Sequence, residues 1–97
     1  MKKAIKLSPT DNVATVLSDV VQGELVGITD KENNVLDDIT SLENIGRGHK
    51  IAVENINSGD RVKKYGYVIG IASKSIAKGE FVHVHNLESS RGRGDLA

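Results

Sequence analysis

The chain has 97 residues and no net charge, because 13 Lys and Arg residues balance 13 Asp and Glu residues. Only 3% of the residues are aromatic, and none is cysteine. This length predicts one domain with a small aliphatic core, and the composition excludes disulfide scaffolds, cysteine nucleophiles and thiolate metal sites. No apolar run approaches the ~20 residues of a membrane span. Because Lys6, Ser8 and Asp11 interrupt any signal peptide, we expect a cytoplasmic protein without membrane contacts.

The charges are separated along the chain. Residues 19–43 carry seven acids and one base, whereas residues 47–93 carry nine bases, four acids and all three histidines. An anionic ligand is therefore expected to bind the second half, unless the fold mixes the two sets of charges on its surface. Nucleic acid is not expected as a partner, because the sequence lacks both a strongly basic balance and the aromatic residues on which single strands stack.

Three segments are predicted in the first half of the chain. Residues 4–7 alternate apolar and polar side chains, as a short edge strand does. Asp11 or Asn12 can cap a short helix over residues 13–17, whose valines and leucine would share one face. Residues 29–45 are rich in acids and asparagine, which predicts a mobile acidic loop.

The strongest internal signal is a repeat of the pattern Ile-x-x-Gly-acid-x-Val. It occurs at residues 56–62 and 76–82, and with Val in place of Ile at residues 20–26. Each copy predicts a strand, a tight turn and a second strand. The glycine allows the positive φ that such a turn requires, and the acid can accept hydrogen bonds from the local backbone. Residues 65–72 predict a buried strand between two of the copies.

These segments together predict a mainly β domain over residues 1–88, made of short strands folded over one another and one short N-terminal helix. Residues 89–97 are predicted to form a flexible, basic, glycine-rich tail. Within this tail, Arg91 can hold a carboxylate.

The clearest chemical pattern is His-x-His on a predicted strand. Strand geometry would place His83 and His85 side by side on one face, with Val82 and Val84 on the core face. Two such imidazoles can transfer protons or converge on one divalent metal, with a third ligand from His49 or from a partner chain. The alternative is an exposed polar strand face that binds nothing.

Two further segments carry groups suited to anions. Residues 46–53 contain two glycines whose backbone N–H groups can approach a ligand, next to Lys50. Tyr65 follows Lys64 and can donate a hydrogen bond or a proton. The alternatives are a flexible hinge for the first segment and a simple core tyrosine for the second.

These residues resemble the SAF-type domain of the altronate/galactarate dehydratase family, which also exists as a separate small subunit, as in sulfolactate sulfo-lyase. The resemblance extends over about residues 4–95, and residues 86–95 are similar to the family's junction with its large catalytic part. The residues that carry it most specifically are Gly48-His49-Lys50-Ile51-Ala52, then Gly59-Asp60-x-Val62-x-Lys64-Tyr65-Gly66-x-x-Ile69-Gly70-x-Ala72, then Gly79-Glu80-x-Val82-His83-x-His85-Asn86.

The resemblance implies a β-clip fold and lyase chemistry on hydroxy acids such as altronate, galactarate or sulfolactate. In that chemistry a base removes the proton α to a carboxylate, and hydroxide or sulfite leaves from the β-carbon. A divalent metal (Fe²⁺, Mn²⁺ or Mg²⁺) assists, and would be shared with a partner chain. The residues expected to take part are His49, His83 and His85 as catalytic groups, Lys50, Lys64, Tyr65, Asn86 and Arg91 as substrate-binding groups, and His83 and His85 also as metal ligands.

A chain of this size is too small to enclose such a site. We therefore expect a small subunit of a hydroxy-acid lyase, inactive alone, that contributes to an interfacial site on a larger catalytic chain. Two alternatives stay open: a free-standing SAF module that binds sugar acids or other carbohydrates without catalysis, and an assembly module in which the histidines are dispensable. An unprotected β edge would also allow a homo-oligomer.

Overall fold

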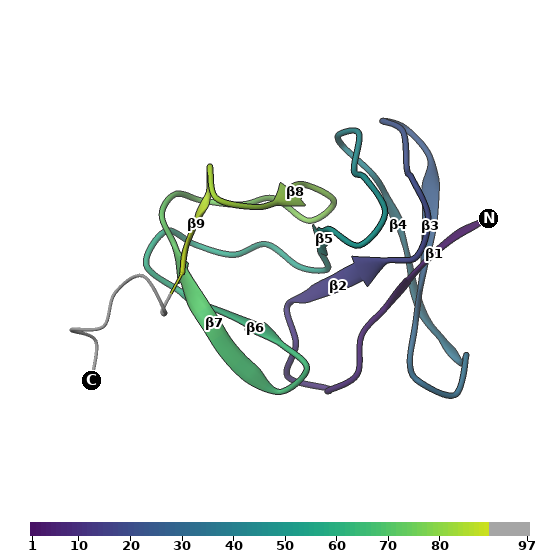
Figure 1. Cartoon of the computed structure of the whole chain (residues 1–97), viewed down its shortest axis with the longest axis horizontal. Coiled ribbons are helices and arrows are strands. Elements are labelled where there is room, and N and C mark those ends of the chain that lie inside the picture. The colour runs from purple at the N-terminus through teal and green to yellow at the C-terminus, as the bar shows by residue number, and fades with distance from the viewer. Residues whose placement is uncertain (90–97) are drawn as a thin grey trace.

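Residues 1–89, the part of the chain that the computed structural model describes, form nine short strands and no helix (Figure 1). One sheet has the order β4-β3-β1-β2-β5-β8 and a second the order β6-β7-β9. Within these residues β1 and β3 pair in parallel, and the other ladders are antiparallel. The prediction of a mainly β domain is confirmed, and the arrangement is compatible with a β-clip. The strands are β1 (Lys2–Ile5), β2 (Val13–Val16), β3 (Leu25–Thr29), β4 (Val35–Thr40), β5 (Lys50–Ala52), β6 (Arg61–Lys64), β7 (Tyr67–Ala72), β8 (Phe81–Val82) and β9 (Leu87–Ser89).

Strand β1 lies inside its sheet, so the prediction of an edge strand is wrong. Ala4 is fully buried and pairs with Val16 of β2 on one side and Ile28 of β3 on the other. The alternation of apolar and polar residues indicated only that one face of the strand is buried. A central strand of an antiparallel sheet with one wet face has the same alternation as an edge strand.

The predicted N-terminal helix is absent, because its residues form β2. This strand lies between two groups of buried side chains: Ala14 and Val16 pack in one group, and Val13 packs in the other. Both faces of the strand are therefore partly apolar. The sequence of β2 thus lacks the alternation of apolar and polar residues that marks a half-buried strand. Leu17, which a helix would have buried, is half exposed.

Asp11 and Asn12, the expected helix caps, instead attach β2 to the β6–β7 hairpin. The buried carboxylate of Asp11 accepts the backbone N–H groups of Tyr65 and Gly66, both at 2.8 Å. Asn12 accepts the N–H of Lys63 at 2.7 Å and donates its amide to the backbone carbonyl of Arg61 at 2.9 Å. Asp and Asn side chains form hydrogen bonds with backbone groups in helix caps, in turns and between distant segments. A capping pattern in the sequence therefore does not say whether the backbone partner is local.

The acidic stretch at residues 29–45 is not a loop over its whole length. Strand β4 lies within it and forms a hairpin with β3, closed by a turn in which Asp30 accepts the N–H groups of Glu32 and Asn34, each at 2.9 Å. Most of β4 is exposed, including the apolar side chains of Val35 and Leu36. Within β4, Asp37 forms an ion pair with Lys78 at 2.9 Å.

The three predicted repeats form the same turn, and residues 45–51 form a fourth turn of this kind, which was not predicted. The glycines of the four turns, Gly23, Gly48, Gly59 and Gly79, have φ between 85° and 96°. The turns associate in two pairs through isolated bridges, Val20 with Ile45 and Ile56 with Ile76. The fourth copy escaped notice because it carries His49 where the other three carry an acid.

The buried side chains form two aliphatic clusters. One is centred on the six-stranded sheet and the other on residues such as Ile56, Val62 and Ile76 near the smaller sheet. Strands β2 and β5 carry residues of both clusters and lie between the two ends of the molecule in Figure 1. Within residues 1–89 there is no helix long and apolar enough to cross a membrane.

Candidate functional site

Lys50 and Lys64 lie close together, although thirteen residues separate them in the sequence. Lys50 begins β5, where it pairs with Thr15 of β2 and Val82 of β8, and Lys64 ends β6 opposite Tyr67. Both lysines line one surface hollow with a volume of about 320 Å³. The other residues lining this hollow, which we call the lysine hollow, are Ile69, His83, Val84, Leu87 and Ser89.

Within residues 1–89, neither lysine of the hollow forms an ion pair with an acid. Burial, followed by the charge of Lys64, lowers the pKa of Lys50. The ion pairs within residues 1–89 join Lys2 to Glu24 and Lys78 to Asp37, so neither lysine of the hollow takes part in one. Two ammonium groups held together without a carboxylate favour the binding of an anion, which would relieve their repulsion.

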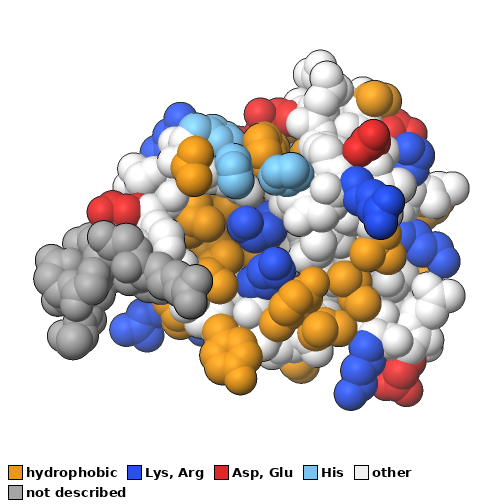
Figure 2. All heavy atoms as spheres, in the orientation of Figure 1, with side chains coloured by type: hydrophobic (Ala, Val, Ile, Leu, Met, Phe, Trp, Pro, Cys, Tyr) orange, Lys and Arg blue, Asp and Glu red, His pale blue; other side chains and the backbone are white. Residues whose placement is uncertain are grey.

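Three histidines gather next to the lysine hollow around the ring of Phe81. His83 stacks on Phe81 with ring centroids 5.5 Å apart, while His49 and His85 lie at 5.6 Å and 5.4 Å from the same ring. His49 also meets His83 edge to face at 5.3 Å. Burial, and then the charges of Lys50, His49 and His85, lower the pKa of His83. Figure 2 shows histidine side chains beside basic and hydrophobic ones on this face.

The prediction of a strand through the two histidines is wrong beyond Val82, where β8 ends. Val84 is 81% exposed instead of facing the core. The chain turns because the amide of Asn86 accepts the N–H of His83 at 3.0 Å and donates to the carbonyl of Phe81 at 2.9 Å. His83 and His85 therefore lie around Phe81 instead of side by side on one strand face.

Asn86 was expected to bind substrate, but its side chain is fully buried within this loop. Both ends of its amide are occupied by backbone groups of the loop, including the N–H of His83. Asn86 thus holds His83 in place and does not face the lysine hollow. Among residues 1–89 there is no group of three or more His, Asp or Glu side chains arranged to hold a metal ion.

Three backbone N–H groups of the glycine segment before Lys50 are not available to a ligand. The N–H of Gly48 donates to the carbonyl of Val16 at 2.9 Å, that of His49 to Gly46 at 3.0 Å, and that of Arg47 to Asp19 at 2.9 Å. These donors are already used within the fold. What this segment contributes to the site is the side chains of His49 and Lys50.

Tyr65 lies at the edge of the site in a strained turn. It has φ of 55° and precedes Gly66 with φ of 83°, a pair of positive values typical of a two-residue hairpin turn. Its hydroxyl donates to Thr15 at 3.0 Å, and the ammonium group of Lys64 lies 4.9 Å from its ring. Thr15 and Asp11 fix this turn. Their role could not be predicted from the sequence, because their hydrogen-bond partners lie some fifty residues away.

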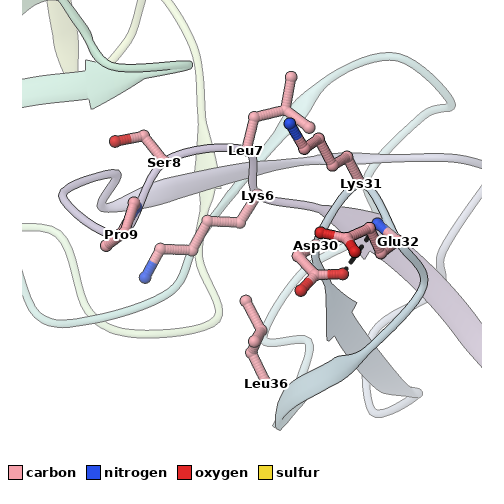
Figure 3. Close-up of a pocket in the computed structure, with 8 residues that line it drawn as sticks. All are labelled: Lys6, Leu7, Ser8, Pro9, Asp30, Lys31, Glu32 and Leu36. Atoms are coloured by element: carbon pink, nitrogen blue, oxygen red, sulfur yellow. Dashed lines mark hydrogen bonds between the residues drawn. The ribbon is translucent and has the colours of Figure 1, made fainter.

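A second hollow, drawn in Figure 3, lies between the segment after β1 and the β3–β4 turn. It is lined by Lys6, Leu7, Ser8, Pro9, Asp30, Lys31, Glu32 and Leu36. Hydrogen bonds, first those from Asn34, lower the pKa of Asp30, whose carboxylate is used to close its own turn. With charges of both signs and no group brought in from the second half of the chain, this hollow selects no ligand class. Arg91, the remaining predicted site residue, lies outside the residues that the structure describes.

Comparison with known proteins gives these features a context. Residues 2–90 match the family described as the altronate/galactarate dehydratase SAF domain. The chain is 41% identical over 90 residues to an altronate dehydratase of Bacillus subtilis, covering 93% of this chain and 17% of the relative. It is 37% identical over 86 residues to an altronate dehydratase of Escherichia coli, covering 89% and 16%. It is 43% identical over 44 residues to subunit alpha of a (2R)-sulfolactate sulfo-lyase of Chromohalobacter salexigens, covering 45% and 47%. The chain thus spans about a sixth of the length of the dehydratases it matches.

Proposed function

The chain belongs to the family of altronate/galactarate dehydratase SAF domains, and from this premise we propose that it supplies the carboxylate-binding part of a hydroxy-acid lyase. The relatives named altronate dehydratase are more than five times as long as this chain, so the remaining part of the active site would come from a larger catalytic chain. The substrate would be a sugar acid of the altronate or galactarate type, or sulfolactate. Each of these compounds carries a carboxylate next to a hydroxyl group.

The observation that carries this proposal is the unpaired lysine couple in the lysine hollow. Lys50 and Lys64 share the hollow and have no acid as a partner within residues 1–89. An ammonium group donates three hydrogen bonds and accepts none, so two of them match the acceptor oxygens of a carboxylate. In this proposal Lys50 and Lys64 hold the carboxylate, and His83 lies next to the carbon atoms that react.

His83 suits a role in hydrogen bonding or proton transfer. Its lowered pKa keeps the imidazole neutral near pH 7, and a neutral imidazole can both accept and donate a proton. Asn86 fixes the backbone of His83, and Phe81 supports its ring. A larger chain covering this face would exclude water and supply the groups that this chain does not have.

The divalent metal implied by the resemblance finds an incomplete set of ligands here. The described part of the chain brings His49 and His83 together but adds no carboxylate, and hard ions such as Mg²⁺ prefer oxygen ligands. Such a metal would take most of its ligands from the larger chain, where it would stabilise negative charge that develops on the substrate. We assign the histidines of this chain to hydrogen bonding and proton transfer.

A titration of the ¹⁵N-labelled chain with galactarate or D-altronate tests the proposal. We expect the backbone signals around Lys50, Lys64 and His83 to shift, and the Lys50→Met and Lys64→Met variants to lose about tenfold or more in affinity, since each removes a charge-assisted hydrogen bond. Lys74→Met is the matched control, because it removes the same charge outside the lysine hollow. If the lysine-hollow variants bind as tightly as the Lys74 variant does, the proposal is wrong.

A free-standing sugar-acid-binding module is the alternative that shares this binding site. The two functions differ in what happens when a large dehydratase chain of this family is added to the purified chain. A lyase subunit would form a stable complex and make turnover depend on Lys50 and Lys64. A binding module would bind the sugar acid equally well alone and leave turnover unchanged.

A further inference from the structure

His49 occupies a position that holds a carboxylate in the three other related turns. In those turns the acid accepts the N–H of the residue three positions earlier: Glu24 from Val21 at 2.7 Å, Asp60 from Asn57 at 3.2 Å, and Glu80 from Ala77 at 3.0 Å. In the fourth turn the equivalent N–H belongs to Gly46, and the residue facing it is His49. This turn keeps the backbone bond from the His49 N–H to the Gly46 carbonyl, but it lacks the side-chain hydrogen bond that the other three turns have.

The contact that replaces this bond fixes the state of the imidazole. His49 Nδ1 lies 3.1 Å from the carbonyl oxygen of Gly46. A carbonyl oxygen only accepts, so Nδ1 must carry the hydrogen, and the neutral ring then has its lone pair on Nε2. Within residues 1–89, the hydrogen bonds of the His49 ring are limited to this contact, so Nε2 has no protein donor.

The ring of His49 also lies at the border of the lysine hollow. It meets His83, which lines the hollow, with ring centroids 5.3 Å apart. The charged groups of the hollow, Lys50 and Lys64, can donate hydrogen bonds but cannot accept them. A hydroxy acid has hydroxyl groups that need an acceptor as well as a carboxylate that needs donors. His49 Nε2 is an acceptor at the edge of a site whose lysines only donate.

We propose that His49 determines specificity: its Nε2 accepts a hydrogen bond from a hydroxyl group of the acid whose carboxylate is held by Lys50 and Lys64. The geometry indicates that this turn exchanges a structural hydrogen bond for a free acceptor at the ligand site. The role of Nε2 rests on the proposed function, whereas the tautomer and the missing turn bond do not. Each part therefore has its own measurement.

The tautomer is read from the imidazole nitrogen shifts of the ¹⁵N-labelled chain at pH 8.5, above the usual range of histidine titration. We expect His49 to show a protonated Nδ1 and an unprotonated Nε2. A protonated Nε2 would overturn the proposal, because the free nitrogen would then be a donor. No ligand is needed for this measurement.

The missing turn bond is tested by exchanging the residue types of two turns. His49→Gln provides a neutral side-chain oxygen for the N–H of Gly46, and we expect the melting temperature to rise by about 2–4 °C. Asp60→His is the reciprocal change and should lower it by a similar amount, because the N–H of Asn57 loses its acceptor. If His49→Gln melts at or below the temperature of the unchanged chain, the turn has not lost a bond, and this part is wrong.

The specificity is tested with galactarate and adipate, six-carbon diacids that differ only in their hydroxyl groups. We expect the unchanged chain to bind galactarate more tightly than adipate. His49→Phe keeps a ring against Phe81, and we expect it to reduce this preference about fivefold, which corresponds to the free energy of one hydrogen bond. Asp60→His should keep the preference. An unaltered preference in His49→Phe would overturn the role of Nε2. Binding of neither acid by the unchanged chain would instead overturn the proposed function, while the nitrogen shifts would still decide the tautomer.

Discussion

His83 shows how one side chain responds to the charges that the fold places around it. Burial lowers its pKa most, followed by Lys50, His49 and His85. We expect Lys50→Met to raise the pKa of His83 and to leave it below its ordinary value, because the burial remains. An NMR titration of the histidine Cε1–H signals measures this, and Lys74→Met should leave the titration unchanged. An identical His83 titration in Lys50→Met would mean that the two groups do not interact.

The same pKa makes the stability of the fold depend on pH. The folded chain binds a proton at His83 less readily than the unfolded chain does, so the unfolded state holds more protons below the ordinary histidine pKa. The contribution of the neutral imidazole is therefore complete above that pKa and is lost as the pH falls toward the lowered one. We expect His83→Gln to lose less stability than the unchanged chain between pH 7.5 and pH 5, measured by urea unfolding at each pH. An equal loss in both chains would contradict this.

Asp11 is one of the residues that fix the position of Lys64 and Tyr65. Its buried carboxylate accepts three backbone N–H groups, from Ser8 at 3.1 Å and from Tyr65 and Gly66 at 2.8 Å. Asp11→Ala would leave these donors without a partner, and we expect urea unfolding to show a loss of about 3 kcal/mol. Asp60→Ala, at an exposed turn with one such bond, is the control and should cost less than about 1 kcal/mol. Equal losses would mean that the buried carboxylate has no special role.

At the scale of elements, the four related turns differ in how closely other chain segments approach them. Gly59 and Gly79 have nearly the same φ, 90° and 96°. A Cβ at Gly59 would meet nothing within 4 Å, whereas at Gly79 it would lie 2.5 Å from the backbone oxygen of Thr40. We expect Gly59→Ala to cost about 1–2 kcal/mol, for the left-handed backbone alone. Gly79→Ala should cost clearly more, because β4 must move away. Thermal unfolding compares the two, and similar costs would show that the turn yields.

Three of the four turns were predictable from the sequence, because each has a glycine followed by an acid, whereas the fourth, with His49 in place of the acid, was not. The strand β2 was not, since both of its faces are buried and its residues gave the spacing of a helix as readily as that of a strand. The end of β8 at Val82 was equally hidden. It depends on the side chain of Asn86, four residues further on, which folds back onto His83. Strand β2 depends on distant segments that bury both of its faces, whereas the end of β8 depends on a local side-chain contact that the alternation of apolar and polar residues does not reveal.

At the scale of the whole molecule, the lysine hollow could be predicted in its residue types but not in its geometry. Lys50, Lys64 and His83 were selected because they follow turn glycines in the basic half of the chain. Their meeting depends on β5 pairing with β8 and on Asp11 holding the β6–β7 hairpin, contacts between segments far apart in the sequence. The burial of Asn86 could not be predicted either, and only burial distinguishes a loop anchor from a ligand-binding amide.

These long-range contacts predict that the molecule unfolds as one unit despite its two clusters. Val13 packs in one cluster and its neighbour Ala14 in the other, so β2 joins them. Both tyrosines lie in the β6–β7 hairpin, and the chain has no tryptophan, so tyrosine fluorescence reports on that hairpin alone. We expect its urea transition to coincide with the loss of far-ultraviolet circular dichroism, which reports on all strands.

Val13→Ala tests this coupling directly. It removes two buried methyl groups beside the hairpin, and we expect a loss of about 2 kcal/mol. Since β2 links the clusters, both transitions should move to lower urea by the same amount and stay superimposed. If tyrosine fluorescence changes first while the dichroism keeps its original midpoint, the hairpin opens on its own. Lys64 would then be held in the site by a segment that can detach from it, and the lysine couple would form fully only when an anion or a larger chain binds across both sheets.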